Sequence, residues 1–345
     1  MGAKILVTGG TGYIGSHTVV ELQKSGYDVI IVDDLSNSIY KIVSLIHKIT
    51  GRMPGFEQLD LCDEKGLNLL FEKHHDLRGV IHFAAHKAVG ESVEKPLKYY
   101  HNNLQSLINL LKCQIDHGVD HFVFSSSCTV YGQPDSLPVS ESAPLKPATS
   151  PYGNTKKIAE DIIRDTIGVS SIRAISLRYF NPVGAHESGL IGELPLGAPQ
   201  NLVPFITQTA IGKQKVLKVF GNDYNTPDGS CIRDYIHVTD LAKAHVVAVE
   251  RLLQVKNEAP YEVFNLGTGN GYSVLEVIDA FEKVTGLKVN MEIAGRRPGD
   301  VEKVWADTAY ANLKLGWKAR LGLEKMMHSA WMWEKNLAAG IIEQA

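Results

Sequence analysis

The sequence has little cysteine, and none of it is paired in a recognisable motif. Its 345 residues include only 4 cysteines, and no two of them are spaced as C-x-x-C. They are Cys62, Cys113, Cys128 and Cys231. Zinc sites and disulfide frameworks usually show such spacing, so we expect neither in this protein. We therefore expect no metal, and a reducing, cytoplasmic location.

The sequence also lacks a charge excess, a long apolar run and a targeting segment. Its 35 basic and 38 acidic residues give a net charge of -3, which gives no electrostatic reason to expect nucleic acid or a membrane surface as a partner. No apolar run approaches the roughly 20 residues that cross a bilayer. The apolar run near the start is short and ends at glycines, so we expect no signal peptide. Leu6 also breaks the myristoylation pattern.

The chain does contain a regular alternation of strand and helix patterns. Continuous apolar runs rich in β-branched residues predict strands at 4–9, 28–34, 79–85, 121–127 and 172–180. Helical patterns that end on glycine lie between them, for example at 15–26 and 99–118. Such runs are typical of a parallel sheet covered on both faces. We predict an α/β fold with a Rossmann-type, doubly wound parallel sheet.

The second half of the chain differs in composition and in the order of its predicted helices and strands. Residues 181–204 are rich in Gly and Pro, which predicts a long ordered loop of the kind that usually carries function. Helices and short strands follow without clean alternation. The length fits about two lobes, so we assign 1–180 to a cofactor domain and 181–345 to a smaller C-terminal α/β lobe. We expect some later segments to pack back on the first domain.

A glycine triplet follows the first predicted strand and opens a helix. Gly9, Gly12 and Gly15 form GxxGxxG, where backbone amides and the helix dipole can bind a pyrophosphate. A lone triplet is weak evidence, but this one has the required strand before it and helix after it. The next strand ends in Asp33, which suits the 2′-hydroxyl of an NAD ribose and would repel the phosphate of NADP. Alternatively, Asp33 and Asp34 simply begin a turn.

A tyrosine and a lysine are spaced to share one face of a helix. Tyr152 and Lys156 stand four residues apart, so their side chains should meet. A phenol has a pKa near 10, and a neighbouring cation lowers that pKa, which makes the phenol a usable base. This spacing also occurs by chance on surface helices. The serine run Ser125-Ser126-Ser127, at the end of a predicted strand facing the ligand crevice, favours the catalytic interpretation, although a serine run is otherwise usually loop.

These motifs together resemble a known family. Their order is similar to that of the extended short-chain dehydrogenases, and within that branch the chain resembles the UDP-glucose 4-epimerases. The matching segments are DDLSNS, HFAAHKAVGESV, SSSCTVYG, SPYGNTKKIAE, RYFNPVGAH, FGNDYNTPDGSCIRDYIHV, FNLGTGNGYSVLEV and RRPGD. They occur in order over nearly the whole chain, so the resemblance does not rest on one motif.

The resemblance implies roles for individual residues around an NAD cofactor. Tyr152 would be the catalytic base and Lys156 its electrostatic partner, which also holds the nicotinamide ribose. Ser127 and Thr129 would hydrogen-bond the reacting 4-oxygen of the sugar. Besides Gly9, Gly12 and Gly15, the implied cofactor contacts are Tyr13 and Ile14 at the pyrophosphate, Asp33, Asn37 and Ser38 at the adenosine ribose, Asp60 and Leu61 at the adenine, and Phe83, Ala84, Lys87, Asn102 and Phe180 along the rest of NAD.

The resemblance also implies a UDP-sugar site and a reaction. The implied substrate contacts are Asn181, Asn201, Leu202, Phe220, Arg233, Arg297 and Asp300, of which the two arginines offer forked donors to a diphosphate. The reaction would be epimerisation at the sugar C4 in galactose metabolism, with hydride passing to NAD and returning to the other face. NAD would be retained and regenerated. The family also implies a homodimer, for which LQSLINLLKCQI is a candidate face, although core packing explains this segment equally well.

Several positions depart from the family pattern. Ala85 and His86 stand where Gly and Leu are common, and we interpret His86 as a packing or surface residue. Cys128 replaces a usual alanine, and we interpret it as a small buried thiol. Val304 lies four residues after Asp300, where the family has either a bulky tyrosine or a smaller residue beside the sugar 2-position. We therefore expect room for UDP-GlcNAc and UDP-GalNAc.

Four other interpretations remain open at this point. A nucleotide-sugar 4,6-dehydratase would need an acidic pair after the strand serine, where this chain has Cys128 and Thr129. Another nucleotide-sugar epimerase of the same branch would share most of the motifs. A catalytically silent NAD-binding regulator often loses the tyrosine or the lysine, and this chain has both. A net dehydrogenase would keep both residues and consume free NAD.

Overall fold

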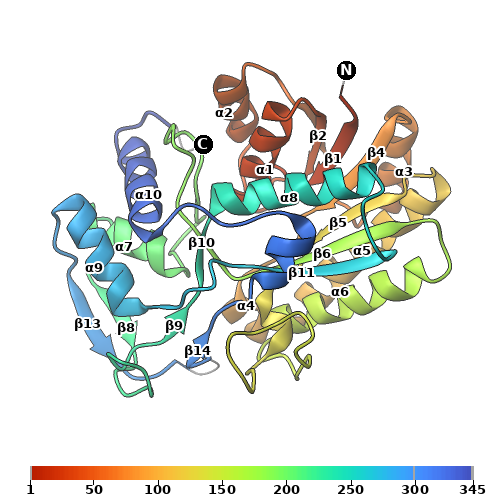
Figure 1. Cartoon of the computed structure of the whole chain (residues 1–345). Helices are drawn as coiled ribbons and strands as arrows, with labels where there is room; N and C mark the ends of the chain where they lie inside the picture. The colour runs from red at the N-terminus through yellow and green to blue at the C-terminus, as the bar shows by residue number, and fades with distance from the viewer. Residues whose placement is uncertain (1, 298–299, 343–345) are drawn as a thin grey trace.

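A seven-stranded parallel sheet forms the centre of the larger lobe (Figure 1). The structure is a computed structural model and describes residues 2–297 and 300–342. The sheet strands are β1 (Lys4–Thr8), β2 (Asp28–Asp33), β3 (Gly55–Gln58), β4 (Leu77–His82), β5 (His121–Ser125), β6 (Arg173–Tyr179) and β11 (Tyr261–Leu266). Most of their residues are buried on both faces, which explains the continuous apolar runs in the sequence.

The strand order makes the sheet doubly wound, as predicted. The order is β11-β6-β5-β4-β1-β2-β3, and every pairing in the sheet is parallel. The direction of winding reverses between β1 and β4. In open sheets of this kind ligands bind at the carboxyl ends of the strands beside such a switch point. The Rossmann-type prediction is confirmed, and the topology places a binding crevice after β1 and β4.

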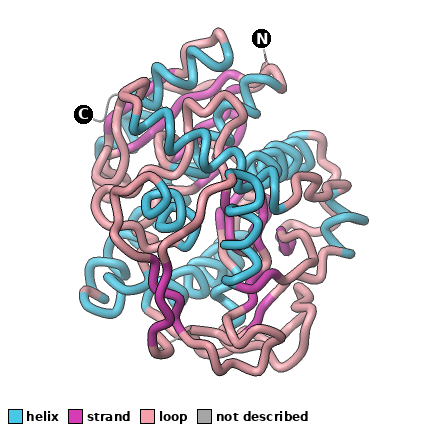
Figure 2. The backbone as a smooth tube through the Cα atoms, turned by 90° about the vertical axis from the view of Figure 1, so that its left-hand side faces the viewer, coloured by secondary structure: helices cyan, strands magenta, loops and turns pink. Residues whose placement is uncertain are grey.

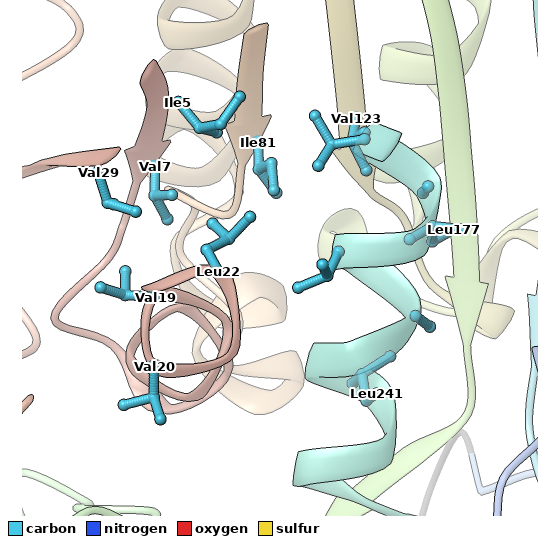
Figure 3. Packing of buried hydrophobic residues seen from close by; sticks show 14 of the residues in the cluster. Ile5, Val7, Val19, Val20, Leu22, Val29, Ile81, Val123, Leu177 and Leu241 are labelled. Atoms are coloured by element: carbon cyan, nitrogen blue, oxygen red, sulfur yellow. The ribbon is translucent and has the colours of Figure 1, made fainter. Parts of the chain in front are cut away.

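Helices cover both faces of this sheet. On one face lie α1 (Tyr13–Lys24), α2 (Lys41–Thr50) and α8 (Val238–Leu253), and on the other lie α3 (Glu64–Lys73), α5 (Pro96–Asp116) and α6 (Pro151–Ile167). Figure 3 shows side chains of α1, including Val19 and Leu22, among those of the sheet strands, such as Val7 and Ile81. Burial of these apolar surfaces holds the layers together.

A smaller lobe lies beside the carboxyl ends of the strands (Figure 1). Its helices are α7 (Leu202–Ala210), α9 (Val274–Thr285) and α10 (Leu323–Ala338). Among the described residues, its short strands form three small sheets: β7 (Asn181–Val183) with β10 (Tyr235–His237), β8 (Leu217–Phe220) with β13 (Met291–Ala294), and β9 (Ile232–Arg233) with β12 (Tyr272–Ser273) and β14 (Lys303–Val304). Ile206, Phe281 and Met326 belong to its own apolar core.

The structure refines the predicted boundaries in the second half. Residues 181–204 were expected to form one loop, but β7 begins at Asn181 and α7 at Leu202, so the loop is shorter. Figure 2 draws helices, strands and loops along the chain in different colours. β7 forms because it pairs with β10, a segment 54 residues later that a local pattern cannot reveal. β11 and α8 also come from the second half, yet β11 forms an edge strand of the large sheet and α8 packs against one of its faces. The division at residue 180 itself stays a prediction.

Within the described residues, no helix combines the length and apolar character needed to cross a membrane.

Candidate active site

The glycine turn connects β1 to α1 at the switch point. Gly9 has φ of 69°, a conformation that favours glycine, and its amide donates to the Val32 carbonyl at 2.7 Å. A side chain on Gly15 would lie 2.2 Å from the Gly9 oxygen. Gly12 caps α1 without a side-chain hydrogen bond. The first N–H groups of a helix have no partner within it, so Tyr13 and Ile14 open α1 with donors suited to an anion.

Asp33 ends β2 beside this turn and is nearly buried. Its Oδ2 accepts from the Thr11 amide at 3.2 Å, and its Oδ1 accepts from the Leu35 amide at 3.0 Å and the Ser38 hydroxyl at 2.9 Å. Asn37 lies exposed on the same loop. These contacts hold a carboxylate where a ribose hydroxyl could donate to it, and the arrangement fits the adenosine end of NAD.

The remaining predicted cofactor residues lie on loops and a helix around the same crevice. Phe83 and Ala84 follow β4, and a side chain on Gly9 would lie 2.8 Å from the Ala84 nitrogen. Asp60 and Leu61 follow β3; Asp60 is exposed and Leu61 is buried. Asn102 lies in α5 and donates to Asn103 at 3.1 Å, Lys87 is exposed after β4, and Phe180 is buried after β6.

Tyr152 and Lys156 lie in the first turns of α6 against the end of β5. Both side chains are buried. The Tyr152 phenol lies within hydrogen-bonding reach of Ser127, whereas the predicted contact of Ser127 with the sugar 4-oxygen stays a prediction. The Lys156 ammonium instead donates to the Ser125 carbonyl at 2.7 Å and lies 4.8 Å from the centre of the Phe124 ring. The structure therefore brings Tyr152, Lys156 and Ser127 together at the end of β5. Ser127 follows this strand, and Lys156 is held by the carbonyl of its last residue, Ser125.

Burial dominates the electrostatics of this pair. It raises the pKa of Tyr152 well above its usual value, and the Ser127 hydrogen bond only partly opposes that rise. Burial also lowers the pKa of Lys156 to about 8, against the opposing effect of Glu160. From the sequence we expected a lowered pKa for the Tyr152 phenol. The protein groups alone do not produce one, so a further positive group beside the phenol would be needed.

Thr129 and Cys128 follow Ser127 in a short 3₁₀ turn. The Thr129 hydroxyl is buried, and no partner for it occurs in the described part of the chain. A buried, unpaired hydroxyl beside Tyr152 and Ser127 suits a ligand oxygen. Burial raises the pKa of Cys128 to about 12, so its thiol stays protonated and packs as a small apolar group.

The smaller lobe contributes arginines and an aromatic side chain. Arg297 pairs with Asp300 through Nη2 at 2.8 Å, and its guanidinium lies 5.5 Å from the centre of the Phe220 ring. Arg233, on β9, lies 3.9 Å from Asp300. The structure thus clusters both predicted arginines around one carboxylate. Pro298 and Gly299 of the RRPGD segment lie outside the described residues.

Val304 connects this cluster to the catalytic end of the sheet. It lies on β14 opposite Arg233 of β9. It is buried and packs in one apolar cluster with Tyr131, Val139 and Phe180. Because Phe180 follows β6, Val304 borders both lobes.

The long loop also supplies Glu193, which was not among the predicted site residues. Its Oε1 accepts from Asn201 at 2.6 Å and pairs with Lys87 at 3.1 Å. It thereby joins a predicted substrate residue to a predicted cofactor residue. Asn201 caps α7 and Leu202 begins it, while Asn181 begins β7 and donates its amide to Asp234. The only signal for Glu193 was its place in a Gly- and Pro-rich loop.

His86 takes a structural place beside the cofactor loop. Asn103 binds its backbone at both ends, accepting from the amide at 2.8 Å and donating to the carbonyl at 3.1 Å. Burial and Lys98 lower the pKa of His86, which favours the neutral ring. In the described residues, no group of three His, Cys, Asp or Glu side chains is arranged to bind a metal.

Comparison with known proteins identifies similar chains. Residues 6–330 match a family model described as GDP-mannose 4,6 dehydratase. A UDP-glucose 4-epimerase from Bos taurus is 48% identical over 352 aligned positions, which cover 100% of both chains.

Two crystal structures of UDP-glucose 4-epimerases are also similar. The enzyme from Stenotrophomonas maltophila, with bound NAD and formylated UDP-arabinopyranose, is 47% identical with a TM-score of 0.94, covering 98% of this chain and 99% of that one. The enzyme from Bifidobacterium longum, in complex with NAD+ and UDP, is 46% identical with a TM-score of 0.93 and the same coverage.

Proposed function

This chain belongs to the UDP-glucose 4-epimerase family and to the wider family described as GDP-mannose 4,6 dehydratase, and from this membership we propose that it interconverts UDP-glucose and UDP-galactose. The reaction inverts C4 of the sugar with NAD as a retained cofactor, and its place is in galactose metabolism. The observation that carries the proposal is the meeting of Tyr152, Lys156 and Ser127 at the crevice where the fold binds ligands.

The residues of the larger lobe fit NAD. The glycine turn and the start of α1 would hold the pyrophosphate, and Asp33 would accept from the adenosine ribose. Lys156 and Phe180 lie at the sheet end, where the nicotinamide half would lie. When bound, NAD supplies the hydride acceptor and donor for the sugar C4. The positive charge of the oxidised nicotinamide would also lower the pKa of Tyr152, which the protein groups alone leave high.

The smaller lobe would hold the nucleotide diphosphate and leave the sugar at Tyr152. Arg233 and Arg297 would bind the diphosphate, and Phe220 would pack against the base. Binding energy from this remote part of the substrate orients the sugar at the reacting carbon. Tyr152 would take the proton of the 4-hydroxyl and later return it, while Ser127 and Thr129 would hydrogen-bond the 4-oxygen.

A dehydratase requires an additional acid that this site does not provide. Elimination of water needs a proton donor for the leaving hydroxyl. Cys128 and Thr129 occupy the place after the strand serine, and burial keeps the Cys128 thiol protonated with a pKa of about 12. A thiol of that pKa is a much weaker acid than a carboxyl group, so the site favours epimerisation.

The direct test is turnover without added cofactor. Purified protein is incubated with UDP-galactose and no added NAD, and the products are resolved by chromatography or proton NMR. UDP-glucose is the expected product. A 4-keto-6-deoxy sugar would identify a dehydratase. Inactivity with and without added NAD would favour a non-catalytic NAD-binding protein.

Val304 supports a second proposal, that N-acetylated sugars are also substrates. Its side chain is buried in the cluster beside Tyr131 and Phe180, and it is much smaller than tyrosine. Val304→Tyr should remove turnover of UDP-GlcNAc while UDP-galactose turnover stays within about threefold, because an added ring fills space near the sugar 2-position. Val304→Ala is the matched control and should retain both activities. A wild-type enzyme that never converts UDP-GlcNAc would contradict this proposal.

We also propose a cytoplasmic homodimer. Leu97, Ile108 and Ile115 on α5 are exposed apolar side chains, with Leu97 81% exposed. Apolar side chains exposed along one helix suit a helix-pair interface between two copies. Analytical ultracentrifugation would give twice the chain mass for a dimer, and the chain mass itself would contradict this.

A further inference from the structure

Helix α6 faces the end of β5 through three contacts, one for each serine of a consecutive triplet. The three helix residues are spaced by four, so they lie along one face of α6. Two of these contacts belong to the candidate catalytic pair, and the third uses a carboxylate that the proposed reaction does not need. The contacts are Tyr152 with Ser127, Lys156 with Ser125, and Glu160 with Ser126.

The third contact includes a buried ion pair. The Ser126 hydroxyl donates to Glu160 Oε1 at 2.6 Å, and both residues are 0% exposed. Arg178 on β6 binds the same carboxylate through two donors, Nε to Oε1 at 2.9 Å and Nη2 to Oε2 at 2.5 Å. A forked pair of this kind fixes both direction and distance, so it specifies geometry as well as supplying energy.

Arg178 is itself held by further partners. Its Nη1 donates to the Tyr131 hydroxyl at 3.0 Å, and that hydroxyl donates to Asn265 at 2.6 Å. The Asn265 amide reaches the Val139 carbonyl at 2.9 Å. Such fully paired networks are rigid, because each unpaired member would cost its desolvation energy. The carboxylate of Glu160 therefore has a fixed position relative to β5, β6 and the apolar cluster around Val304.

We propose that Ser126, Glu160 and Arg178 form a positioning unit that sets α6 against the end of β5, so that Ser127 meets Tyr152 and Lys156 meets the Ser125 carbonyl. The unit rests on the proposed function, since it serves the proton transfer at Tyr152. These three residues are positioning residues, because they act through their neighbours. The geometric reason is the single-residue spacing of the triplet: a small shift of Ser126 moves Ser125 and Ser127 with it.

The unit also sets the charge around Lys156. The groups facing the Lys156 ammonium are the Ser125 carbonyl, the Phe124 ring, Glu160 and the buried His82. Glu160 raises the pKa of Lys156 and so opposes the effect of burial. Burial keeps His82 neutral, so it adds no charge near neutral pH. Loss of the Glu160 charge should therefore deprotonate Lys156 at lower pH.

The first test removes one hydroxyl and leaves the ion pair in place. Ser126→Ala, measured as purified holoenzyme with UDP-galactose, should lower kcat about tenfold, with KM and bound NAD content unchanged, because small misplacements of reacting groups are costly. Ser176→Ala is the matched control: Ser176 is a buried serine on neighbouring β6, bonded to Tyr261 at 2.8 Å. A Ser126→Ala enzyme whose kcat equals that of the control would overturn the proposal.

The second test examines the charge. Glu160→Gln retains an acceptor for Ser126 and removes the negative charge. The alkaline limb of its kcat against pH should move to lower pH, by about one unit or more. If Glu160→Gln does not fold, Glu160→Asp and Arg178→Lys provide milder changes, and each should lower kcat with KM retained. Purely structural residues would lower thermal stability and leave the pH profile in place, which would contradict the proposed role.

A readout without turnover separates this proposal from the proposed function. Alkaline titration of the tyrosinate ultraviolet absorbance, with Tyr152→Phe as the reference, reports ionisation of Tyr152 alone. We expect Ser126→Ala to change that titration even if the substrate differs from UDP-galactose. If wild-type protein converts no UDP-sugar and the titration still changes, the assigned reaction is wrong and the positioning unit stands. If the enzyme converts UDP-galactose but Ser126→Ala leaves the Tyr152 titration unchanged, the assigned reaction stands and the positioning unit is wrong.

Discussion

At the residue level, burial controls the ionisation of the polar groups in the candidate site. Tyr152, Lys156 and Ser127 are all buried, and burial works against the charged form of each ionisable group. The Tyr152 phenol is therefore neutral in the protein alone, and a bound cation would be needed to lower its pKa. This dependence makes the chemistry conditional on the cofactor, which fits an enzyme that retains it.

Removal of the phenol hydroxyl should separate binding from chemistry. Tyr152→Phe should lower kcat by about 10²–10⁴-fold, the usual contribution of a general acid–base group, with NAD content unchanged. UDP-galactose turnover and the absorbance of released cofactor provide the two measurements. Tyr261→Phe is the control, since Tyr261 is a partly buried tyrosine bonded to Ser176. An active Tyr152→Phe enzyme would remove this residue from the mechanism.

The carboxylate of Asp33 should determine the choice between NAD and NADP. Its oxygens are fixed by Thr11, Leu35 and Ser38 at the end of β2. Asp33→Asn removes the charge that would repel a 2′-phosphate and should raise the affinity for NADP relative to NAD by at least about tenfold. Isothermal titration of cofactor-free protein gives both affinities. Asp34→Asn, one residue along the chain, is the control and should change neither.

At the scale of elements, helix starts determine where side chains enter the crevice. Ser150 caps α6 by accepting from the Gly153 amide at 3.2 Å, and Pro151 follows at the first helical position. Tyr152 is therefore fixed within the first turn. In the smaller lobe, Ser273 and Glu276 form a capping box at the start of α9. The two caps differ in function, because only α6 carries candidate catalytic residues.

The cap of α9 should contribute to stability without affecting chemistry. Ser273 accepts from the Glu276 amide at 3.0 Å and donates to Asp228. Ser273→Ala should lower the free energy of unfolding by about 1–2 kcal/mol, with kcat unchanged. Urea unfolding followed by circular dichroism measures the change. Ser142→Ala, an exposed serine bonded to Ser140, should stay within about 0.5 kcal/mol of wild type.

For the whole molecule, the contact between the two lobes includes buried histidines as well as apolar side chains. His17 on α1 contacts the ring of His186 in the long loop, and His237 precedes α8. Burial lowers the pKa of His17 and His82 to about 3, and that of His237 and His245 to about 4. These rings are neutral in the folded protein and would be charged in the unfolded chain below pH 6.5.

The folded protein should therefore lose stability as pH falls below about 6.5. In that range the unfolded state binds more protons than the native state, and each histidine contributes up to about 1.4 kcal/mol per pH unit. Urea midpoints at about pH 7 and about pH 5 measure the loss. His245→Leu should reduce the slope, since His245 Nε2 is buried without a partner in the described structure. An unchanged slope would contradict this assignment.

The sequence predicted the sheet more completely than the site. The alternation of buried strands and helices predicted the Rossmann-type sheet, because its period is local. The start of β7 was missed, because its pairing with β10 is distant in sequence. Tyr152 and Lys156 could be selected from their helical spacing together with the serine run at a strand end, and the family resemblance singled out Ser127. Glu193, Glu160 and Arg178 could not, because their partners lie 8 to 106 residues away.

The fold class, the glycine turn and the Tyr152–Lys156 spacing could be predicted from the sequence, because local periodicity and spacing within one turn of a helix specify them. The residues assigned to the nucleotide sugar were implied by the family resemblance. The folded chain was needed to find that Lys156 binds the Ser125 carbonyl and that Asp300 pairs with Arg297 and lies near Arg233. The physical reason is that burial and pairing partners arise from packing between distant segments, and these determine the charge and the position of each group.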